Sequence, residues 1–252
     1  MAELFPRQTP GARVIETSPG EWRLSIPAGP AGAYRWAQLD DYMHLHRKDF
    51  RWDAPVQLSL QARVSDQQHA GTWGMGFWND PFSMGAGAQG TRWRLPALPN
   101  TAWFFFASPP NHLSFQNRTP ASGMLAGVFA SRPPGLFRLL PLGLSLPLSL
   151  WKQTAYIPRK ALQNSIREDF VQLQQDWTAW HDFAVQIQPD RTIFLLDGQI
   201  CHQTALQPHG KLGLVLWIDN QYARFAPGER LQTGTLASPA ETWLELRSIS
   251  VS

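Results

Sequence analysis

The feature that most restricts the fold of this chain is a set of stretches in which apolar residues recur at every second position. In a β-strand successive side chains point to opposite faces, so this alternation predicts strands with one buried face. The longest stretch spans residues 56–65. Shorter ones are Glu21–Ile26, 183–187 and 212–218, and two further candidate strands are Thr101–Ala107 and 243–251. Strands at both ends of the chain predict one antiparallel sandwich closed by its C-terminal strand.

The composition supports the same fold class. Charged residues make up 16% of the 252 residues, well below the roughly 25% of ordinary domains, which disfavours a long helical or coiled-coil protein. The 19 Gly and 21 Pro residues indicate many turns, and a length of 252 residues suits a single sandwich domain. We therefore predict an all-β jelly-roll sandwich that spans residues 1–252 and carries one short helical insertion.

Residues 132–177 interrupt the strand pattern and form the predicted insertion. Its first part, residues 135–151, is rich in Leu and contains Pro141 and Pro147, which exclude a central strand. It is too short and too interrupted to span a membrane comfortably. Its second part, residues 158–173, predicts an amphipathic helix. The apolar stripe of that helix would be Leu162, Ile166, Phe170 and Leu173.

The net charge of +3 is concentrated in this insertion. Residues 132–169 contain six basic and two acidic residues, and the remainder of the chain is close to neutral. A surface for nucleic acid over the whole protein is therefore disfavoured, and we expect no nucleic-acid partner. Two readings of the insertion remain open. It either docks on a membrane surface or a protein partner, or it packs on the sandwich.

The cysteine and histidine residues and the absence of known nucleotide-binding motifs exclude several classes of site. Cys201 is the only cysteine, so an internal disulfide and a multi-thiolate zinc site are both excluded. His44 and His46 share a strand face, but no further ligands are in view, so we expect a surface pair and no metal. No phosphate-binding or dinucleotide motif occurs, and no cofactor is expected. The first residues do not resemble a secretion signal, so we expect a cytoplasmic protein.

Residues 180–198 resemble a strand pair of the concanavalin A-like lectin/glucanase superfamily, in particular of its laminarinase-type members. The resemblance rests on Trp180, His181 and Phe183 in the first strand, a Pro189-Asp190 turn, and a second strand that ends in Asp197-Gly198. It implies a jelly-roll sandwich whose concave sheet forms a ligand groove.

The chain departs from that family in its catalytic motif. Laminarinase-type catalysis uses Glu-x-Asp-x-x-Glu on one strand, and no Glu-x-Asp occurs here. Glu168 and Asp169 fall in the predicted helix. Retaining hydrolysis needs a nucleophile and an acid about 5–5.5 Å apart, so we expect no laminarinase-type reaction.

Two predicted strands end alike, each with a Trp followed by Asp and Asn. Alternation turns both Trp residues away from the core, and Gly74 and Gly76 would leave room for a ligand beside the first. Indole plates with carboxylate and amide groups suit carbohydrate recognition. The ligand-binding candidates are Trp78, Asn79, Trp217, Asn220, Gln221 and Tyr222.

Asp80 and Asp219 are candidates for a general acid/base pair. The alternative is turn chemistry, in which the Asp and Asn side chains bind nearby backbone. The sequence thus favours a carbohydrate-binding or glycoside-hydrolase-like protein that uses its concave face. The alternative function is a non-enzymatic interaction module that acts through the insertion.

Overall fold

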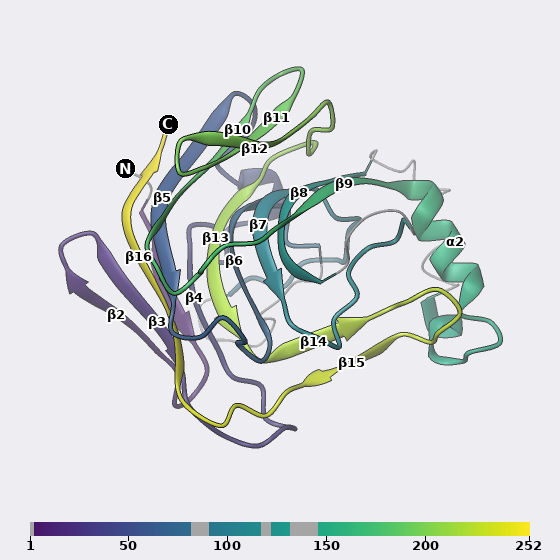
Figure 1. Cartoon of the computed structure of the whole chain (residues 1–252). Coiled ribbons are helices and arrows are strands. Elements are labelled where there is room, and N and C mark those ends of the chain that lie inside the picture. Colours follow the sequence, from purple (N-terminus) through teal and green to yellow (C-terminus); the bar gives the residue numbers. More distant parts are fainter. Residues whose placement is uncertain (1–2, 82–90, 117–121, 132–145) are drawn as a thin grey trace.

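The fold is a sandwich of two seven-stranded antiparallel sheets (Figure 1). The computed structural model describes residues 3–81, 91–116, 122–131 and 146–252. Sheet A has the strand order β1 (Phe5–Gln8), β4 (Trp36–Asp40), β13 (Gly213–Asp219), β6 (Thr72–Trp78), β7 (Thr101–Ala107), β8 (Gly123–Ser131) and β9 (Ile166–Leu173). Sheet B has the order β12 (Gln199–Thr204), β11 (Thr192–Leu196), β10 (His181–Ile187), β5 (Val56–Val64), β16 (Thr242–Val251), β3 (Glu21–Ile26) and β2 (Arg13–Ser18). The predicted fold class is confirmed.

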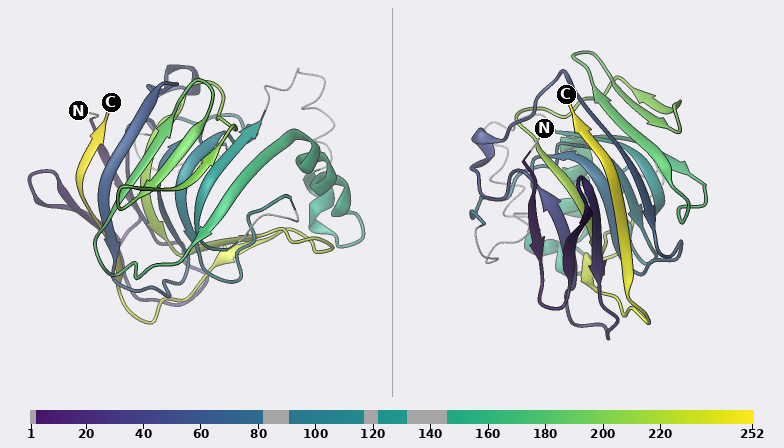
Figure 2. Two further views of the ribbon diagram at one scale, coloured as in Figure 1. Left: turned by 45° about the horizontal axis from the view of Figure 1, so that its top comes forward. Right: turned by 90° about the vertical axis from the view of Figure 1, so that its left-hand side faces the viewer.

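Smaller elements lie beyond sheet A. Two short strands, β14 (Gln221–Arg224) and β15 (Gln232–Thr235), pair with each other. Among the described residues, the 3₁₀-helices are η1 (Arg47–Asp49) and η2 (Leu146–Leu150), and the α-helix α2 (Tyr156–Ser165) follows η2. Figure 1 and the left-hand view of Figure 2 place α2 next to β9 at one end of the molecule.

The two sheets differ in how they are buried. Along β5 of sheet B, buried and partly exposed residues alternate without a break, as the period-two pattern predicts. In β6, β7 and β13 of sheet A every residue is buried. One face of sheet A packs on sheet B, so its other face must also be covered.

The helix predicted over residues 158–173 is wrong in its second half. The helix is α2, and residues 166–173 form β9, which pairs with β8 along its whole length. Ile166 and Phe170 lie four residues apart, a spacing that fits one helix face and also one strand face. The long-range pairing with β8 decides between the two. The predicted leucine-rich arm lies largely outside the described residues, and its described end is η2.

The hairpin that carries the family resemblance forms as predicted from β10 and β11. The turn that follows β11 and leads into β12 contains Asp197 and Gly198, both with positive φ. The Asp197 carboxylate lies 2.7 Å from the His181 ring and accepts a hydrogen bond of 2.9 Å from the backbone N–H of Asp182. His181 therefore has a structural role in this turn.

The contact between the sheets gives a first prediction. Phe104 of β7 is fully buried, and its ring lies 4.9 Å from that of Phe183 and 5.4 Å from that of Phe194, both in sheet B. Replacing it with Ala should lower the free energy of unfolding by about 3–5 kcal/mol in chemical denaturation. Ile200→Ala, at a residue 60% exposed in the same sandwich, should change it by about 0.5 kcal/mol or less. Equal effects of the two changes would contradict this description of the core.

Candidate functional site

The outer face of sheet A, which faces away from sheet B, is a layer of aromatic rings. The strand register places these aromatic residues on the face opposite the core residues Met75, Phe77 and Phe104. The layer consists of Trp36, Trp78, Trp103, Phe105, Phe129, Phe170 and Trp217, which form one buried cluster. The predicted parity of Trp78 and Trp217 is thus correct.

The glycines in this layer make room for the neighbouring aromatic rings. A Cβ atom added to Gly74 would lie 2.6 Å from the Trp217 ring, and one added to Gly76 would lie 2.6 Å from the Cβ of Trp103. Real Cβ atoms do not approach so closely. The same relation holds for Gly127 with Phe170 and for Gly213 with Tyr42. The expectation that Gly74 and Gly76 leave room for a ligand is therefore wrong, because side chains of this protein occupy the space.

Trp78 and Trp217 stack on each other. Their ring centroids are 6.5 Å apart, the planes are 6° from parallel, and each residue is only 7% exposed. The Trp217 Nε1–H donates to Thr72 Oγ1 at 3.0 Å. The covering side chains come from the segment after β4, the loops after β6 and β7, and α2: Tyr42, Met43, Phe50, Leu98, Leu113, Phe115, Ala161 and Leu162. Ligand stacking on these two indoles would require the covers to move apart, and it stays a prediction.

Asp80 and Asp219 do not lie close together. In the antiparallel pairing of β6 and β13, Asp219 is opposite Thr72, whereas Asp80 follows Trp78 at the other end of β6. The six residue steps of β6 from Thr72 to Trp78, at about 3.3 Å each, separate its two ends by roughly 20 Å. Neighbouring antiparallel strands run in opposite directions, so the carboxyl-terminal ends of β6 and β13 lie at opposite ends of the strand pair. Asp80 and Asp219 therefore do not form an acid/base pair.

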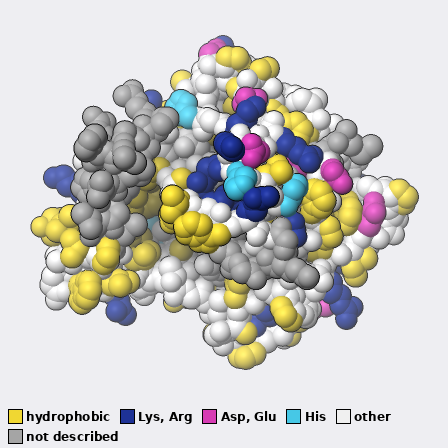
Figure 3. Space-filling view, turned by 180° about the vertical axis from the view of Figure 1, so that it is seen from behind, with side chains coloured by type: hydrophobic (Ala, Val, Ile, Leu, Met, Phe, Trp, Pro, Cys, Tyr) yellow, Lys and Arg dark blue, Asp and Glu magenta, His cyan; other side chains and the backbone are white. Residues whose placement is uncertain are grey.

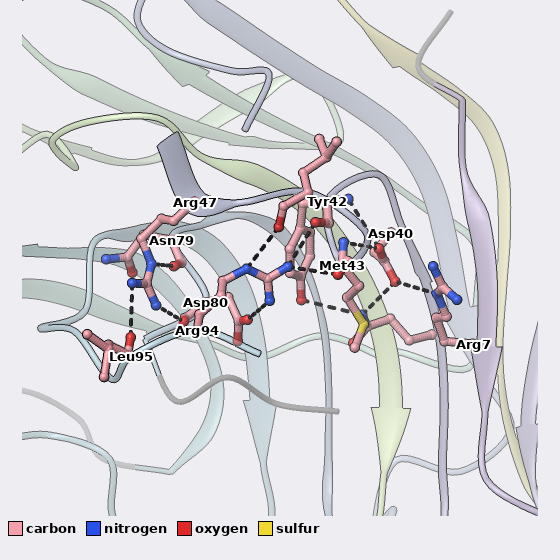
Figure 4. Close-up of polar contacts among 11 residues, drawn as sticks. Arg7, Asp40, Tyr42, Met43, Arg47, Asn79, Asp80, Arg94 and Leu95 are labelled. Carbon is pink, nitrogen blue, oxygen red and sulfur yellow. Dashed lines mark hydrogen bonds and ion pairs between the residues drawn. The ribbon is translucent and has the colours of Figure 1, made fainter. Parts of the chain in front are cut away.

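Asp80 is held in a buried ion pair with Arg94 at 2.7 Å (Figure 4). The Arg94 guanidinium also donates to the carbonyls of Tyr42 and Met43, both at 2.9 Å. Arg47 donates to the carbonyls of Asn79 and Asp80 and to that of Leu95. These bonds fasten residues 91–95 to the segment after β4, and they assign Asp80 a structural role.

The two asparagines likewise bind backbone. Asn79 donates to the Leu98 carbonyl at 2.9 Å and accepts from the N–H of Asn100 at 3.0 Å. Asn220 accepts from the N–H of Arg35 at 2.8 Å and donates to two carbonyls. Both asparagines bind backbone, as the turn alternative expected, but their partners lie in segments 16 or more residues away, so they tie loops together and do not stabilise a local turn. Gln221 and Tyr222, at the start of β14, are the partly exposed members of the predicted set.

Asp219 has an unusual environment for a carboxyl group. It is buried, it accepts from Thr72 Oγ1 at 2.7 Å and from the Gln221 N–H at 3.1 Å, and the Tyr34 hydroxyl lies 3.4 Å away. Burial raises the pKa of Asp219 to about 7, against the opposing effect of these hydrogen bonds. Tyr34 and Thr72 were not predicted for this position. Thr72 shares the strand parity of Trp78, but Tyr34 comes from a loop whose position the pattern does not reveal.

A hollow lies between the edge strands β9 and β12. Its volume is about 600 Å³, and it is lined by Gln116, Arg167, Glu168, Asp169, Gln203, Thr204, Ala205 and Leu206. The Glu168 carboxylate accepts from the N–H groups of Phe115 and Gln116, so it serves to hold that loop. Glu168 and Asp169 are neighbours on a strand and point to opposite faces. None of these eight lining residues has an aromatic side chain on which a sugar ring could stack.

A more exposed group of side chains lies where residues 91–95 meet the segment after β4. It consists of His46, Arg47, Arg92, Trp93 and Leu95, hereafter the Trp93 surface. The Trp93 side chain is 69% exposed and Leu95 is 67% exposed. The Arg92 guanidinium lies 2.7 Å from the His46 ring and donates to the His44 carbonyl. The neighbouring helix η1 lies on the face shown in Figure 3, where Lys, Arg and His side chains gather.

Comparison with known proteins supplies structural similarities alone. No protein-family model matches the chain, and no curated protein matches its sequence. LamAcat from Zobellia galactanivorans is 8% identical, with a TM-score of 0.48, over 93% of this chain and 78% of that one. The laminarinase catalytic domain from Thermotoga maritima is 11% identical, with a TM-score of 0.45, over 96% and 80%. Alginate lyase AlyC3 is 8% identical, with a TM-score of 0.46, over 92% and 74%. The structural resemblance predicted from residues 180–198 is thus found, and no function follows from it.

The packing of the aromatic layer predicts that Trp217 behaves as a core residue. Trp217→Ala should lower the free energy of unfolding by about 3–5 kcal/mol, because it opens a cavity and leaves the Thr72 hydroxyl without its donor. Trp93→Ala should change it by about 0.5 kcal/mol or less, since that ring is largely exposed. Urea denaturation of both variants measures the difference, and a small effect of Trp217→Ala would show that the layer is not packed.

The pKa of Asp219 predicts a pH-dependent contribution to stability. Because the folded protein holds this proton more tightly than the unfolded chain does, the carboxyl destabilises the fold as pH rises from about 4 to about 7. Asp219→Asn removes the titration. The stability of the variant relative to wild type should therefore rise over this range, by about 4 kcal/mol at most, at 1.36 kcal/mol per pKa unit. Parallel denaturation curves at pH 4 and pH 8 test it, and an unchanged difference would contradict the raised pKa.

Proposed function

We propose that the protein binds carbohydrate and that the sugar stacks on the indole of Trp93. The observation that carries the proposal is a Trp ring that is 69% exposed on a backbone segment fixed by hydrogen bonds. The C–H face of a sugar ring packs well on an indole, and neighbouring donors orient its hydroxyl groups. The covered aromatic layer of sheet A offers no such access in the described structure.

The position of Trp93 depends on the arginines on either side of it. Arg94 points inward, is 5% exposed, and bonds to Asp80 and to the carbonyls of Tyr42 and Met43. The backbone N–H of Arg92 donates to the Met43 carbonyl at 2.9 Å. Between these two anchors the indole projects outward. Because the backbone on both sides of Trp93 is already fixed, a ligand that stacks on the ring does not have to order that segment, which favours binding.

The charge around Trp93 favours an acidic sugar. The adjacent Arg92 is basic and its guanidinium lies 2.7 Å from the His46 ring, whereas Arg94 is paired with Asp80. The facing segment adds Arg47, His46 and the exposed Lys48; of its acidic residues, Asp49 is exposed, Asp41 is buried and Asp53 pairs with Lys211. Guanidinium groups are hydrogen-bond donors without acceptors, and they bind carboxylates and sulfates more strongly than hydroxyl groups. A uronate or sulfated polysaccharide is therefore the ligand class that fits this surface.

Calorimetric titration with uronate-containing and neutral oligosaccharides tests the function. The wild-type protein should bind the acidic series more tightly, and added salt should weaken that binding. Trp93→Ala should lose about 1–3 kcal/mol of binding free energy, as expected when a central aromatic contact is removed.

The matched control is Trp151→Ala, because Trp151 is 57% exposed and lies on a different part of the chain. Its affinity should equal that of wild type. Failure of every oligosaccharide to bind, or full affinity in Trp93→Ala, would contradict the proposal.

A further inference from the structure

Residues 150–157 form a second exposed apolar cluster, hereafter the tip. Its large side chains are Leu150, Trp151, Tyr156 and Ile157, which are 56%, 57%, 64% and 39% exposed. They account for four of the nine large apolar side chains that are exposed within the described residues. Such a concentration in eight residues is costly in water and marks a contact surface.

The backbone of the tip is well supported. Thr154 Oγ1 donates to the Leu148 carbonyl at 2.8 Å, and the Ala155 N–H donates to the Trp151 carbonyl at 2.9 Å. Ser149 is buried and accepts a backbone bond from Leu231 at 2.8 Å. The apolar side chains are therefore displayed on a fixed frame. Figures 1 and 2 place α2, whose first residues belong to the tip, at the end of the molecule farthest from both termini.

The structure also shows which side of α2 is free. Ala161 and Leu162 pack on the aromatic layer of sheet A, and Ile166 and Phe170 belong to β9. The apolar stripe predicted for the amphipathic helix therefore packs inside the protein, which was one of the two readings left open. The exposed apolar side chains sit at the start of the helix and in the turn before it.

The charge next to the tip is positive. Lys152 and Lys160 are exposed, and no acidic residue occurs between residues 81 and 167. The acidic group that acts on Lys152 is Glu229, which is itself bound to Arg224 at 2.6 Å. Trp and Tyr prefer the boundary between lipid headgroups and acyl chains, and Lys near that boundary is attracted by anionic lipid.

We propose that the tip inserts into the surface of a membrane that contains anionic lipid. The contact we propose is interfacial, with the four apolar side chains at the depth of the lipid headgroups. Among the residues that the structure describes, no helix has the length and apolar character needed to cross a bilayer. A protein partner fits less well, because four side chains form a patch much smaller than the roughly 800 Å² per partner of a stable interface, and Lys is depleted from such interfaces. This inference does not depend on the proposed carbohydrate site.

The test is flotation of the full chain with phosphatidylcholine vesicles, with and without phosphatidylserine. The wild-type protein should float with the phosphatidylserine vesicles. Trp151→Ala/Tyr156→Ala should reduce the bound fraction about tenfold or more, and Lys152→Glu/Lys160→Glu should abolish the preference for anionic lipid. Trp93→Ala is the matched control and should float as wild type does. Thermal melting verifies that each variant is folded, and Trp151→Glu alone replaces the double variant if that one unfolds.

Three outcomes would overturn the proposal. The first is a wild-type protein that binds neither vesicle. The second is a folded tip variant that binds as well as wild type. The third is a concentration-dependent dimer that the tip substitutions abolish in the absence of vesicle binding, because the tip would then be a contact between copies of the protein.

Discussion

The interlocking of rings and glycines on the outer face of sheet A determines much of what this protein can do. Trp217 occupies the space above Gly74, and Trp103 occupies the space beside Gly76. A larger residue at Gly74 would collide with the Phe104 carbonyl and the Trp217 ring, and one at Gly76 would collide with the backbone of the neighbouring strand at Ala102 and Trp103. This layer gives sheet A two apolar faces, as in sheets covered on both sides. The surface that would serve as a groove in an open sandwich is thereby filled by the protein's own side chains.

The polar contacts follow from this closure. The segments that cover the layer need polar contacts that fix their position. Arg94 supplies such contacts, because it pairs with Asp80 and donates hydrogen bonds to the carbonyls of the segment after β4. The same anchoring projects Trp93 into solvent. Carbohydrate recognition at Trp93 and membrane contact at residues 150–157 thus both depend on segments whose first task is to cover sheet A. Because these segments lack acidic residues, both surfaces favour anionic partners.

Much of the fold could be predicted from sequence, because alternation is a local property of a strand. Residues 56–65 and 101–107 show two patterns of apolar residues in a strand. The first alternates strictly and has one buried face, whereas the second is apolar at almost every position and has two. That contrast was the available signal that the outer face of sheet A is covered. The strand at residues 166–173 and the separation of Asp80 from Asp219 depend on register between distant segments, which the sequence pattern does not contain. Tyr34 reaches Asp219 from a loop for the same reason.

The central claim is that the aromatic layer is closed while Trp93 and Trp151 are open to solvent. Hydroxyl-radical footprinting with mass spectrometry measures this directly, residue by residue, on the native protein. The account predicts rapid oxidation of Trp93 and Trp151 and strong protection of Trp78, Trp103 and Trp217, in line with exposures of 69% and 57% against 8% or less. Rapid oxidation of Trp78 and Trp217 would contradict it, because the outer face of sheet A would then be an open groove.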